Sequence, residues 1–319
     1  MALGQAHTGV PSLAALFKEY FHLPFVEALP QDLFALKRFS RENGVGKGYS
    51  FKVHYGRNES AGPYRERDNF GNPGHQEYID AFVPYKLYKV EVEVTKFMIA
   101  ATRGRGGYLE EFTNESRQAL KDLRHRMNRD LLKPGRDPDD VDKIAFDSIG
   151  EIVDDGQVNG ATGYAGIDFA THPWWKPYVI ASTDGEPLTL TLEMMQDVTE
   201  KLWQPERDAN ITAIWTSKKH FNDYCALMDD RRRYFNTMKV DGGYTGASFE
   251  SHTIIAVPGL PNGDMYFLDE GEFKYSVLND FDTEEKSVMR DARYLVATHY
   301  ANLVCRDLKK QGRITDLEY

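Results

Sequence analysis

Residues 47–99 constrain the fold more than any other stretch, because they contain two strand-like runs that lie far apart in the sequence. The first run alternates apolar and polar side chains from Tyr49 to Tyr55, and the second does so from Val90 to Val94. Such alternation predicts two half-buried strands. The segment between them, residues 56–82, is polar and rich in glycine and proline. It exceeds the roughly 12–15 residues of a long connection in a compact domain.

Two isolated strands are marginal in water unless a third strand or a helix covers their apolar face. We therefore expect the pair to form an extended hairpin whose apolar stripe meets a second copy of the chain. A functional lid or a loop without fixed structure is the alternative. The residues predicted to make the contact between copies are Phe51, Val53, Tyr55, Val90 and Val92.

The composition and charge limit the functions that the chain can have. With 319 residues, 41% of them hydrophobic, it can bury a large core and is expected to divide into two or more lobes. A net charge of −10 disfavours a nucleic-acid reader, since phosphate binding depends on clustered lysine and arginine. Cys225 and Cys305 lie far apart without metal-ligand spacing, which indicates buried thiols in a reducing compartment. The sequence contains neither a signal-peptide pattern nor an apolar run of the length that a membrane helix needs.

The order of the predicted elements is typical of an α+β fold and not of a doubly wound sheet. A short amphipathic helix after Ser12 is followed by prolines and has the character of an arm. Residues 108–132 carry apolar side chains at helical spacing and predict one long helix. Further helices are expected over 192–203 and after Ser217, which can cap the helix that follows it. Strands are expected at 211–215, 253–257, 265–268, 273–277 and 294–306.

The candidate catalytic and ligand motifs are incomplete. The run Gly44–Gly48 lacks the spacing, the Ser or Thr and the preceding buried strand of a phosphate loop, so we interpret it as a hinge at the base of the hairpin. The acidic run 137–142 lacks the central glycine and the closing glutamate of a calcium loop. Cys225 falls on the apolar face of a predicted helix, where a thiol is inert. We therefore predict no catalytic residue, no cofactor and no metal site.

Trp174 and Trp175 provide the alternative from the class of enzymes. With Asp168 and Glu186 they could form a sugar platform beside paired carboxylates, as in a carbohydrate-active enzyme. Two aromatic residues flanked by prolines more often form a packed corner, and we favour that interpretation.

Arg231, Arg232 and Arg233 form the one strongly basic cluster and directly follow two aspartates. At a helix end these opposite charges can satisfy the helix dipole and each other. The alternative is an ion pair across a subunit boundary, so we include the three arginines among the predicted assembly residues.

Residues 211–315 contain several segments that together resemble a known family. In order and spacing they are similar to the C-terminal part of the major capsid protein of tailed bacteriophages, which has the Hong Kong 97-type fold. The arrangement upstream agrees with that family, whose subunits have an arm, an extended hairpin and a long helix. The segments that carry the resemblance are Ile211–Ser217, Arg232–Thr237, Asp241–Tyr244, Gly263–Asp269, Tyr300–Arg306 and Gln311–Thr315.

The resemblance implies an α+β, Hong Kong 97-type capsid fold in four parts. The N-terminal part would be an arm, and the next an extended β-hairpin called the E-loop. A peripheral domain would contain the long spine helix, and an axial domain would lie at the capsomer centre. The implied bounds are 1–40 for the arm, 41–104 for the E-loop, 105–184 and 281–319 for the peripheral domain with its spine helix over 108–132, and 185–280 for the axial domain.

The function implied by the resemblance is that of a coat subunit, not of an enzyme. Hexamers and pentamers of it would close into an icosahedral head that encloses double-stranded DNA. Its partners would be further copies of itself, a separate scaffolding protein, a portal, a decoration protein and the packaged DNA, with no membrane. The subunit would reside in the host cytoplasm before assembly and in the virion afterwards. The shell of an encapsulin-type nanocompartment, which resembles the same fold, is the nearer alternative.

Overall fold

The computed structural model describes residues 33–58, 60–66, 74–97, 107–133, 144–182, 184–229, 238–239, 245–286 and 292–318. For 107–114, 238–239, 245–246 and 285–286 only the backbone is described. Three sequence predictions therefore lie outside the described residues. They concern the helix after Ser12, the acidic run 137–142 and the cluster Arg231–Arg233.

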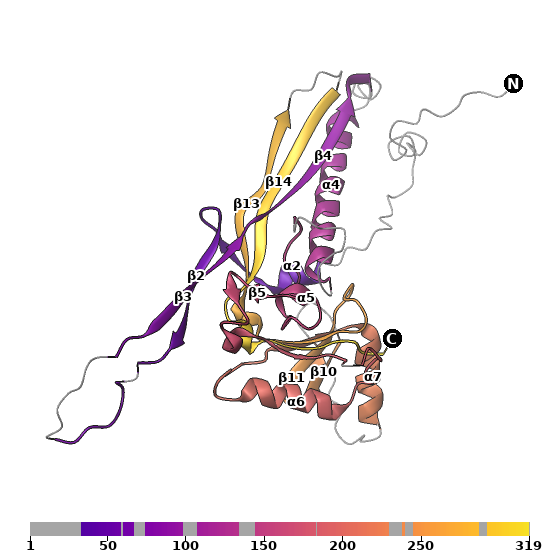
Figure 1. Ribbon diagram of the computed structural model, residues 1–319. Coiled ribbons are helices and arrows are strands. Elements are labelled where there is room, and N and C mark those ends of the chain that lie inside the picture. The colour runs from indigo at the N-terminus through magenta and orange to yellow at the C-terminus, as the bar shows by residue number, and fades with distance from the viewer. Residues whose placement is uncertain are drawn as a thin grey trace. The chain divides into compact units, whose positions relative to one another are not determined.

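One sheet has four strands in the order β1-β13-β14-β4, with β1 parallel to β13 and the other pairs antiparallel. The long helix α4 (Gly107–Leu131) contacts β4 and β14 and runs beside them (Figure 1). The Tyr88 hydroxyl on β4 donates to Asp130 Oδ2 on α4 at 2.8 Å. Because side chains alternate along a strand, Val90, Val92 and Val94 share this α4-facing side with Tyr88. The strands are β1 (Ser40–Asn43), β4 (Lys86–Thr95), β13 (Phe273–Lys286) and β14 (Ala292–Cys305).

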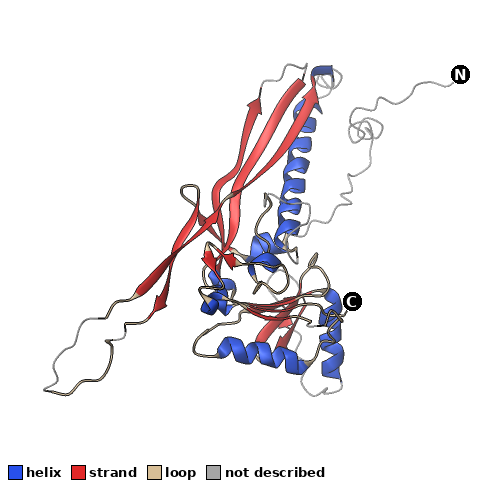
Figure 2. Cartoon of the chain, in the orientation of Figure 1, coloured by secondary structure: helices blue, strands red, loops and turns tan. Residues whose placement is uncertain are grey.

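The second sheet has seven strands in the order β7-β15-β12-β8-β11-β10-β9. Its central strands β8 and β12 are buried at every position, as expected of strands covered on both faces. Helices α6 (Leu192–Trp203) and α7 (Lys218–Asp229) pack on it (Figure 2). The strands are β7 (Tyr178–Ile180), β8 (Ala213–Thr216), β9 (Met238–Lys239), β10 (Thr245–Phe249), β11 (His252–Ala256), β12 (Met265–Leu268) and β15 (Gly312–Ile314).

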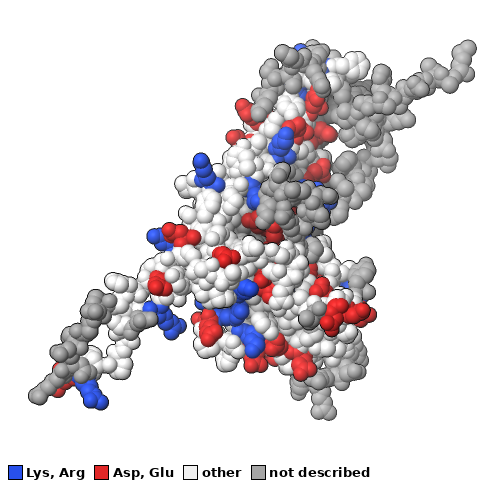
Figure 3. Space-filling view, viewed as in Figure 1, with Lys and Arg blue, Asp and Glu red and all other residues white. Residues whose placement is uncertain are grey.

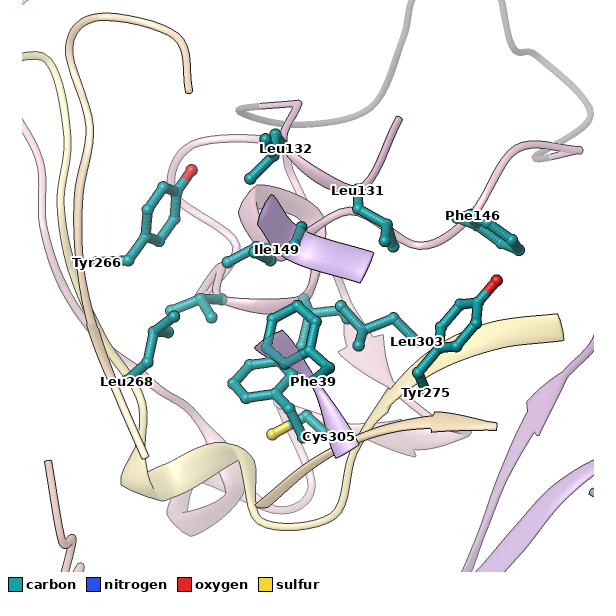
Figure 4. Close-up of a cluster of buried hydrophobic side chains, with 14 of the residues drawn as sticks. Phe39, Leu131, Leu132, Phe146, Ile149, Tyr266, Leu268, Tyr275, Leu303 and Cys305 are labelled. Carbon is teal, nitrogen blue, oxygen red and sulfur yellow. The ribbon is translucent and has the colours of Figure 1, made fainter. Parts of the chain in front are cut away.

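Two hydrophobic clusters hold these layers together. In the first, Met195, Val198 and Leu202 of α6 are fully buried with residues of the seven-stranded sheet. The other includes Phe39, Leu268 and Leu303, which come from three distant parts of the chain and point toward one another in Figure 4. Since this cluster takes residues from both sheets, it fixes the base on which the β2–β3 hairpin stands.

The remaining elements are short or belong to the hairpin. Strand β2 pairs with β3 in an antiparallel hairpin, and β5 pairs with β6 in a smaller one. The bounds are α2 (Phe34–Arg38), β2 (Gly48–Gly56), β3 (Glu77–Pro84), α5 (Ile149–Ile152), β5 (Gly163–Tyr164), β6 (Ile167–Asp168), η1 (Pro173–Trp175), η2 (Glu270–Glu272) and η3 (Leu308–Lys310).

The α+β fold is confirmed, as are the long helix, the helix over 192–203 and the five predicted strands. Ser217 caps α7 as predicted, since its Oγ accepts from the backbone N–H of His220 at 3.4 Å. The sequence analysis did not predict several short elements of the described residues, among them helices α2 and α5, the 3₁₀ turns η1, η2 and η3, and strands β1, β5, β6, β7, β9 and β10. The C-terminal segment differs from the implied peripheral domain, which included residues 281–319. Strand β15 of this segment joins the seven-stranded sheet and not the sheet beside α4.

The predicted pairing of residues 49–55 with residues 90–94 is wrong. The first run, in β2, pairs with β3, which lies largely inside the segment that we interpreted as a connection. The second run, in β4, pairs with β14. The physical reason is that Ile79, Ala81 and Val83 give β3 an apolar side of its own, while the valines of β4 are covered by α4.

Candidate assembly surfaces

The inner face of the β2–β3 hairpin packs on its own chain. The register places Phe51 opposite Ala81 and Val53 opposite Ile79, so these four side chains lie on one face. Ala81 is buried, and the other three are half-buried against the core cluster of Figure 4. Phe51 and Val53, two of the predicted interface residues, therefore already have partners within the chain.

The outer face of the hairpin carries exposed aromatic side chains. Tyr78 is 55% exposed and Phe82 is 48% exposed. The His54 ring lies 4.9 Å from that of Tyr78, and Lys52 forms an exposed ion pair with Asp80. Such an ion pair contributes little. Large aromatic groups on an ordered strand are the side chains that protein interfaces favour.

The sequence prediction missed Tyr78 and Phe82, because it treated residues 56–82 as a connection. The signal that could have identified β3 is the period-two pattern of Ile79, Ala81 and Val83, which places the intervening residues on the opposite face.

The hairpin is tied to the segment that contains β5, β6 and η1. The ring of Tyr55 stacks on Trp174 with centroids 5.4 Å apart and an interplanar angle of 9°. The backbone N–H of Phe82 donates to the carbonyl of Ala165 at 2.9 Å. Farther along, Asn58 Nδ2 donates to the carbonyl of Gly74 at 3.0 Å and so joins the two ends of the loop. The predicted interface residue Tyr55 thus fixes the direction of the hairpin within its own chain.

The hairpin is also fixed at the point where β3 turns into β4. The Tyr85 hydroxyl lies 3.1 Å from Ser276 Oγ. A Cβ on Gly44 would lie 1.9 Å from this hydroxyl, so only glycine allows the approach. Asn302 Nδ2 donates to the carbonyl of Pro84 at 2.9 Å. The run Gly44–Gly48 connects β1 to β2. A phosphate loop is followed by a helix, whereas this run is followed by a strand, so it is not a phosphate loop.

The four-stranded sheet has an open face on the side away from α4 (Figure 1). Tyr294, Val296, Thr298 and Tyr300 of the central strand β14 alternate with Ala297 and His299, which lie on the α4 side. Exposed residues of the neighbouring strands flank them, including Leu87, which is 64% exposed. On the α4 side, Val92 is buried and Val90 is half-buried, so these predicted interface residues also have partners within the chain. Within this row Val296 is buried, and Tyr294, Thr298 and Tyr300 are half-buried, so the accessible part of the face is the half-buried tyrosines with the exposed side chains that flank them.

A buried histidine lies on the α4 side of the same sheet. His299 is 1% exposed, its Nε2 lies 2.8 Å from the Tyr275 hydroxyl, and its ring stacks on Phe281 at 4.4 Å. Its Nδ1 lies 3.6 Å from Asp280 Oδ1. Burial lowers the pKa of His299 to about 4, so the ring is neutral at neutral pH.

The residues of the enzyme alternative do not form an open site. Trp175 is fully buried, and one face of Trp174 is covered by Tyr55. Hydrogen bonds from Thr171 hold the pKa of Asp168 below its usual range, which is the opposite of what a catalytic acid requires. Trp174 and Trp175 therefore form the packed corner that we favoured.

Other candidate chemistry is equally weak among the described residues. No group of three or more His, Cys, Asp or Glu side chains there could hold a metal ion. None of the described helices has the length and apolar character to cross a membrane. Burial raises the pKa of the Cys305 thiol. Cys225 packs against the hydrophobic cluster that contains Met195, Val198 and Leu202 of α6. Acidic and basic side chains are interspersed over the described part of the face in Figure 3.

Comparisons with known proteins point to one class of protein. The family model of the SU10 major capsid protein matches residues 87–318. No curated protein matches the chain in sequence. Among solved structures, the capsid asymmetric unit of cyanophage A-1(L) is 15% identical with a TM-score of 0.75, over 92% of this chain and 95% of that one. The capsid of a native GTA particle is 10% identical with a TM-score of 0.61, over 97% of this chain and 100% of that one.

A nanocompartment shell has a similar structure. The SrpI encapsulin of Synechococcus elongatus PCC 7942 is 10% identical with a TM-score of 0.58, over 97% of this chain and 96% of that one. At such identities the likeness concerns the fold. The fold is the Hong Kong 97-type capsid fold that the sequence resemblance implied.

Proposed function

The chain belongs to the SU10 major capsid protein family, and from this premise we propose that copies of it assemble into hexameric and pentameric capsomers. These capsomers close into an icosahedral head around the double-stranded DNA of a tailed phage. The role is structural and not catalytic. A net charge of −10 and a surface of mixed charge support this proposal, because a strongly basic wall would bind the packaged DNA and impede its movement.

The observations that carry the proposal are two surfaces on one chain, an exposed aromatic face and a half-buried row of tyrosines. The hairpin presents Tyr78 and Phe82 on a face that its own chain leaves exposed. The four-stranded sheet presents the row from Tyr294 to Tyr300 on the side away from α4. We propose that the outer face of one hairpin lies on the open sheet face of the next copy. A head-to-tail contact of this kind closes into rings, and many such contacts add by avidity.

The parts of the subunit take the roles that the family resemblance implied. We assign α4 as the spine helix, the four-stranded sheet to the peripheral domain and the seven-stranded sheet to the axial domain. The arm is proposed over 1–40 and the E-loop over 41–104, in which the β2–β3 hairpin is the extended part and β4 joins the four-stranded sheet. A separate scaffolding protein, a portal and a decoration protein complete the head. Before assembly the subunit resides in the host cytoplasm.

The encapsulin alternative rests on the similarity to the SrpI shell. The family match favours a phage head. Purified particles separate the two: a phage head contains double-stranded DNA when it is isolated from virions, whereas a nanocompartment contains a co-purifying cargo protein and no genome.

The assembly role of the hairpin is tested with the double variant Tyr78→Ser, Phe82→Ser. Both side chains are about half exposed, so the variant should remain folded and lose only a small part of its stability in denaturant unfolding. It should fail to form closed shells, as seen by negative-stain electron microscopy, at concentrations at which the parent chain forms them. Val53→Ala is the matched control: it removes an apolar group from the inner face and should lower stability while leaving shell formation intact. Normal shells from the double variant would refute the proposed contact.

A further inference from the structure

A groove at the C-terminal end of α6 lies outside the surfaces considered so far. Its volume is about 470 Å³. It lies between the last turns of α6 and the turn that joins β10 to β11. The lining residues are Gln196, Thr199, Glu200, Trp203, Ala209, Ile211, Glu250 and His252. They include two carboxylates and an indole but no lysine or arginine.

Trp203 is the most unusual of these side chains. It is the last residue of α6 and is 82% exposed, whereas Trp175 and Trp215 are fully buried. Trp is highly buried on average, so an indole left in solvent at the edge of a groove indicates a contact surface. The face of an indole attracts a guanidinium or ammonium group more strongly than any other aromatic face does.

The polar groups of the groove are acceptors held in fixed positions. Glu250 accepts hydrogen bonds from Thr199 Oγ1 at 3.1 Å and Gln196 Nε2 at 3.3 Å, which orient its carboxylate against α6. His252 Nδ1 lies 2.9 Å from the carbonyl oxygen of Ile211. A carbonyl can only accept, so Nδ1 carries the proton, and in the neutral ring Nε2 is left as an acceptor. Glu200 adds a second, exposed carboxylate.

The helix itself adds to this charge. The C-terminal end of a helix carries a partial negative charge and favours cations. Together, the helix end, the two carboxylates and Trp203 make a site for a planar cation with several donors, and arginine is the side chain of that description.

We propose that this groove receives an arginine of the cluster Arg231–Arg233 from a neighbouring copy of the chain. The cluster is the only run of three Lys or Arg residues in the sequence and begins two residues after the end of α7, a helix that packs on the same seven-stranded sheet as α6. A ring of identical subunits then repeats the contact head to tail around its axis. The inference rests on the proposed function, since it requires the capsomer.

The contact is tested by cysteine crosslinking of assembled particles. The variant Glu200→Cys, Arg232→Cys should give a ladder of crosslinked oligomers on a non-reducing gel after mild oxidation. Glu200→Cys alone and the pair Glu318→Cys, Arg232→Cys are the controls and should give monomers. A crosslink confined to the monomer would show that the cluster fills its own groove, and the absence of any crosslink would show that it does not reach the groove. Either result overturns the proposal.

Charge reversal provides a second, independent readout. Glu200→Arg with Glu250→Arg should raise the protein concentration needed for assembly by about tenfold or more, which corresponds to about 1.4 kcal/mol. Reversal of all three arginines to glutamate in the same chain should restore assembly. If the parent chain forms shells while neither reversal changes the required concentration, this inference fails and the capsid function stands. If the parent chain forms no shells at all, the proposed function fails first.

Discussion

Acidification should weaken the subunit through His299, the buried histidine between the four-stranded sheet and α4. Every group that faces its ring belongs to one of three elements. Tyr275, Asp280 and Phe281 come from β13, Arg124 from α4, and Arg41 from β1. Asp280 favours the protonated ring, but it is already paired with Arg41 at 2.7 Å. Burial and the two arginines oppose protonation, and they prevail.

The size of the effect follows from the two pKa values. An exposed histidine in the unfolded chain has a pKa of about 6.5. In the folded chain the pKa of His299 is about 4. Between these values the unfolded chain binds a proton that the folded chain does not, so the free energy of unfolding falls as the pH falls. The pKa difference of about 2.5 at about 1.4 kcal/mol per unit corresponds to a loss of about 3 kcal/mol when the pH reaches 4.

The assay is urea unfolding of the unassembled subunit, followed by tryptophan fluorescence at several pH values from 7 to 4. Other groups also titrate in this range, so the informative quantity is the difference between the parent chain and His299→Gln, whose amide does not titrate. The variant should lose about 3 kcal/mol less than the parent chain over this range. His54→Gln, which removes an exposed histidine from the hairpin, should follow the parent chain. Parallel pH profiles for the parent chain and His299→Gln would refute the reasoning.

Two further predictions concern the base on which the hairpin stands. Asp264→Asn should lower the free energy of unfolding by about 3 kcal/mol, because it removes the carboxylate that lies 2.8 Å from Nη2 of Arg313, which is 1% exposed. The matched change Asp80→Asn in the exposed pair with Lys52 should cost less than about 1 kcal/mol in the same denaturation experiment. Gly163→Ala should destabilise the subunit by about 1–3 kcal/mol, since its Cβ would lie 2.3 Å from the carbonyl oxygen of Ile167. Gly62→Ala, with no atom within 4 Å of its Cβ, should leave the thermal midpoint unchanged, and equal midpoints for both alanine variants would contradict the clash.

Three helices, α4, α6 and α7, and seven of the fifteen described strands could be predicted, because their signals are local. The apolar positions of 108–132 follow the helical period, and Ser217 provides a cap that is visible in the sequence. The strand residues of 265–268 are apolar throughout, as in a strand buried on both faces. These properties are set by neighbours a few residues away, so the surrounding fold did not alter them.

The pairing of the strands and the identity of the exposed side chains could not be predicted in this way. The valines of β4 and the alternating run of β2 have the same period-two pattern, which indicates a strand but does not indicate its partner. The pattern also does not tell whether an apolar stripe faces α4, as Val92 does, or a neighbouring molecule. Strand β15 joined the other sheet through contacts with β12 and β7, which lie about 50 and about 130 residues away in sequence. Such distant contacts leave no local signal.

The structure changes where the binding energy between subunits should be sought. Because Tyr85, Asn302 and the Tyr55–Trp174 stack hold the hairpin at several points, its direction is fixed before a neighbour arrives. A contact that is already oriented loses less conformational entropy when it forms. In the contact that we propose, the half-buried stripe of Phe51 and Val53 is the support, and the exposed Tyr78 and Phe82 are the groups that meet the neighbour. It follows that Trp174→Ala, which leaves every exposed side chain of the outer face unchanged, should weaken assembly through the direction of the hairpin alone.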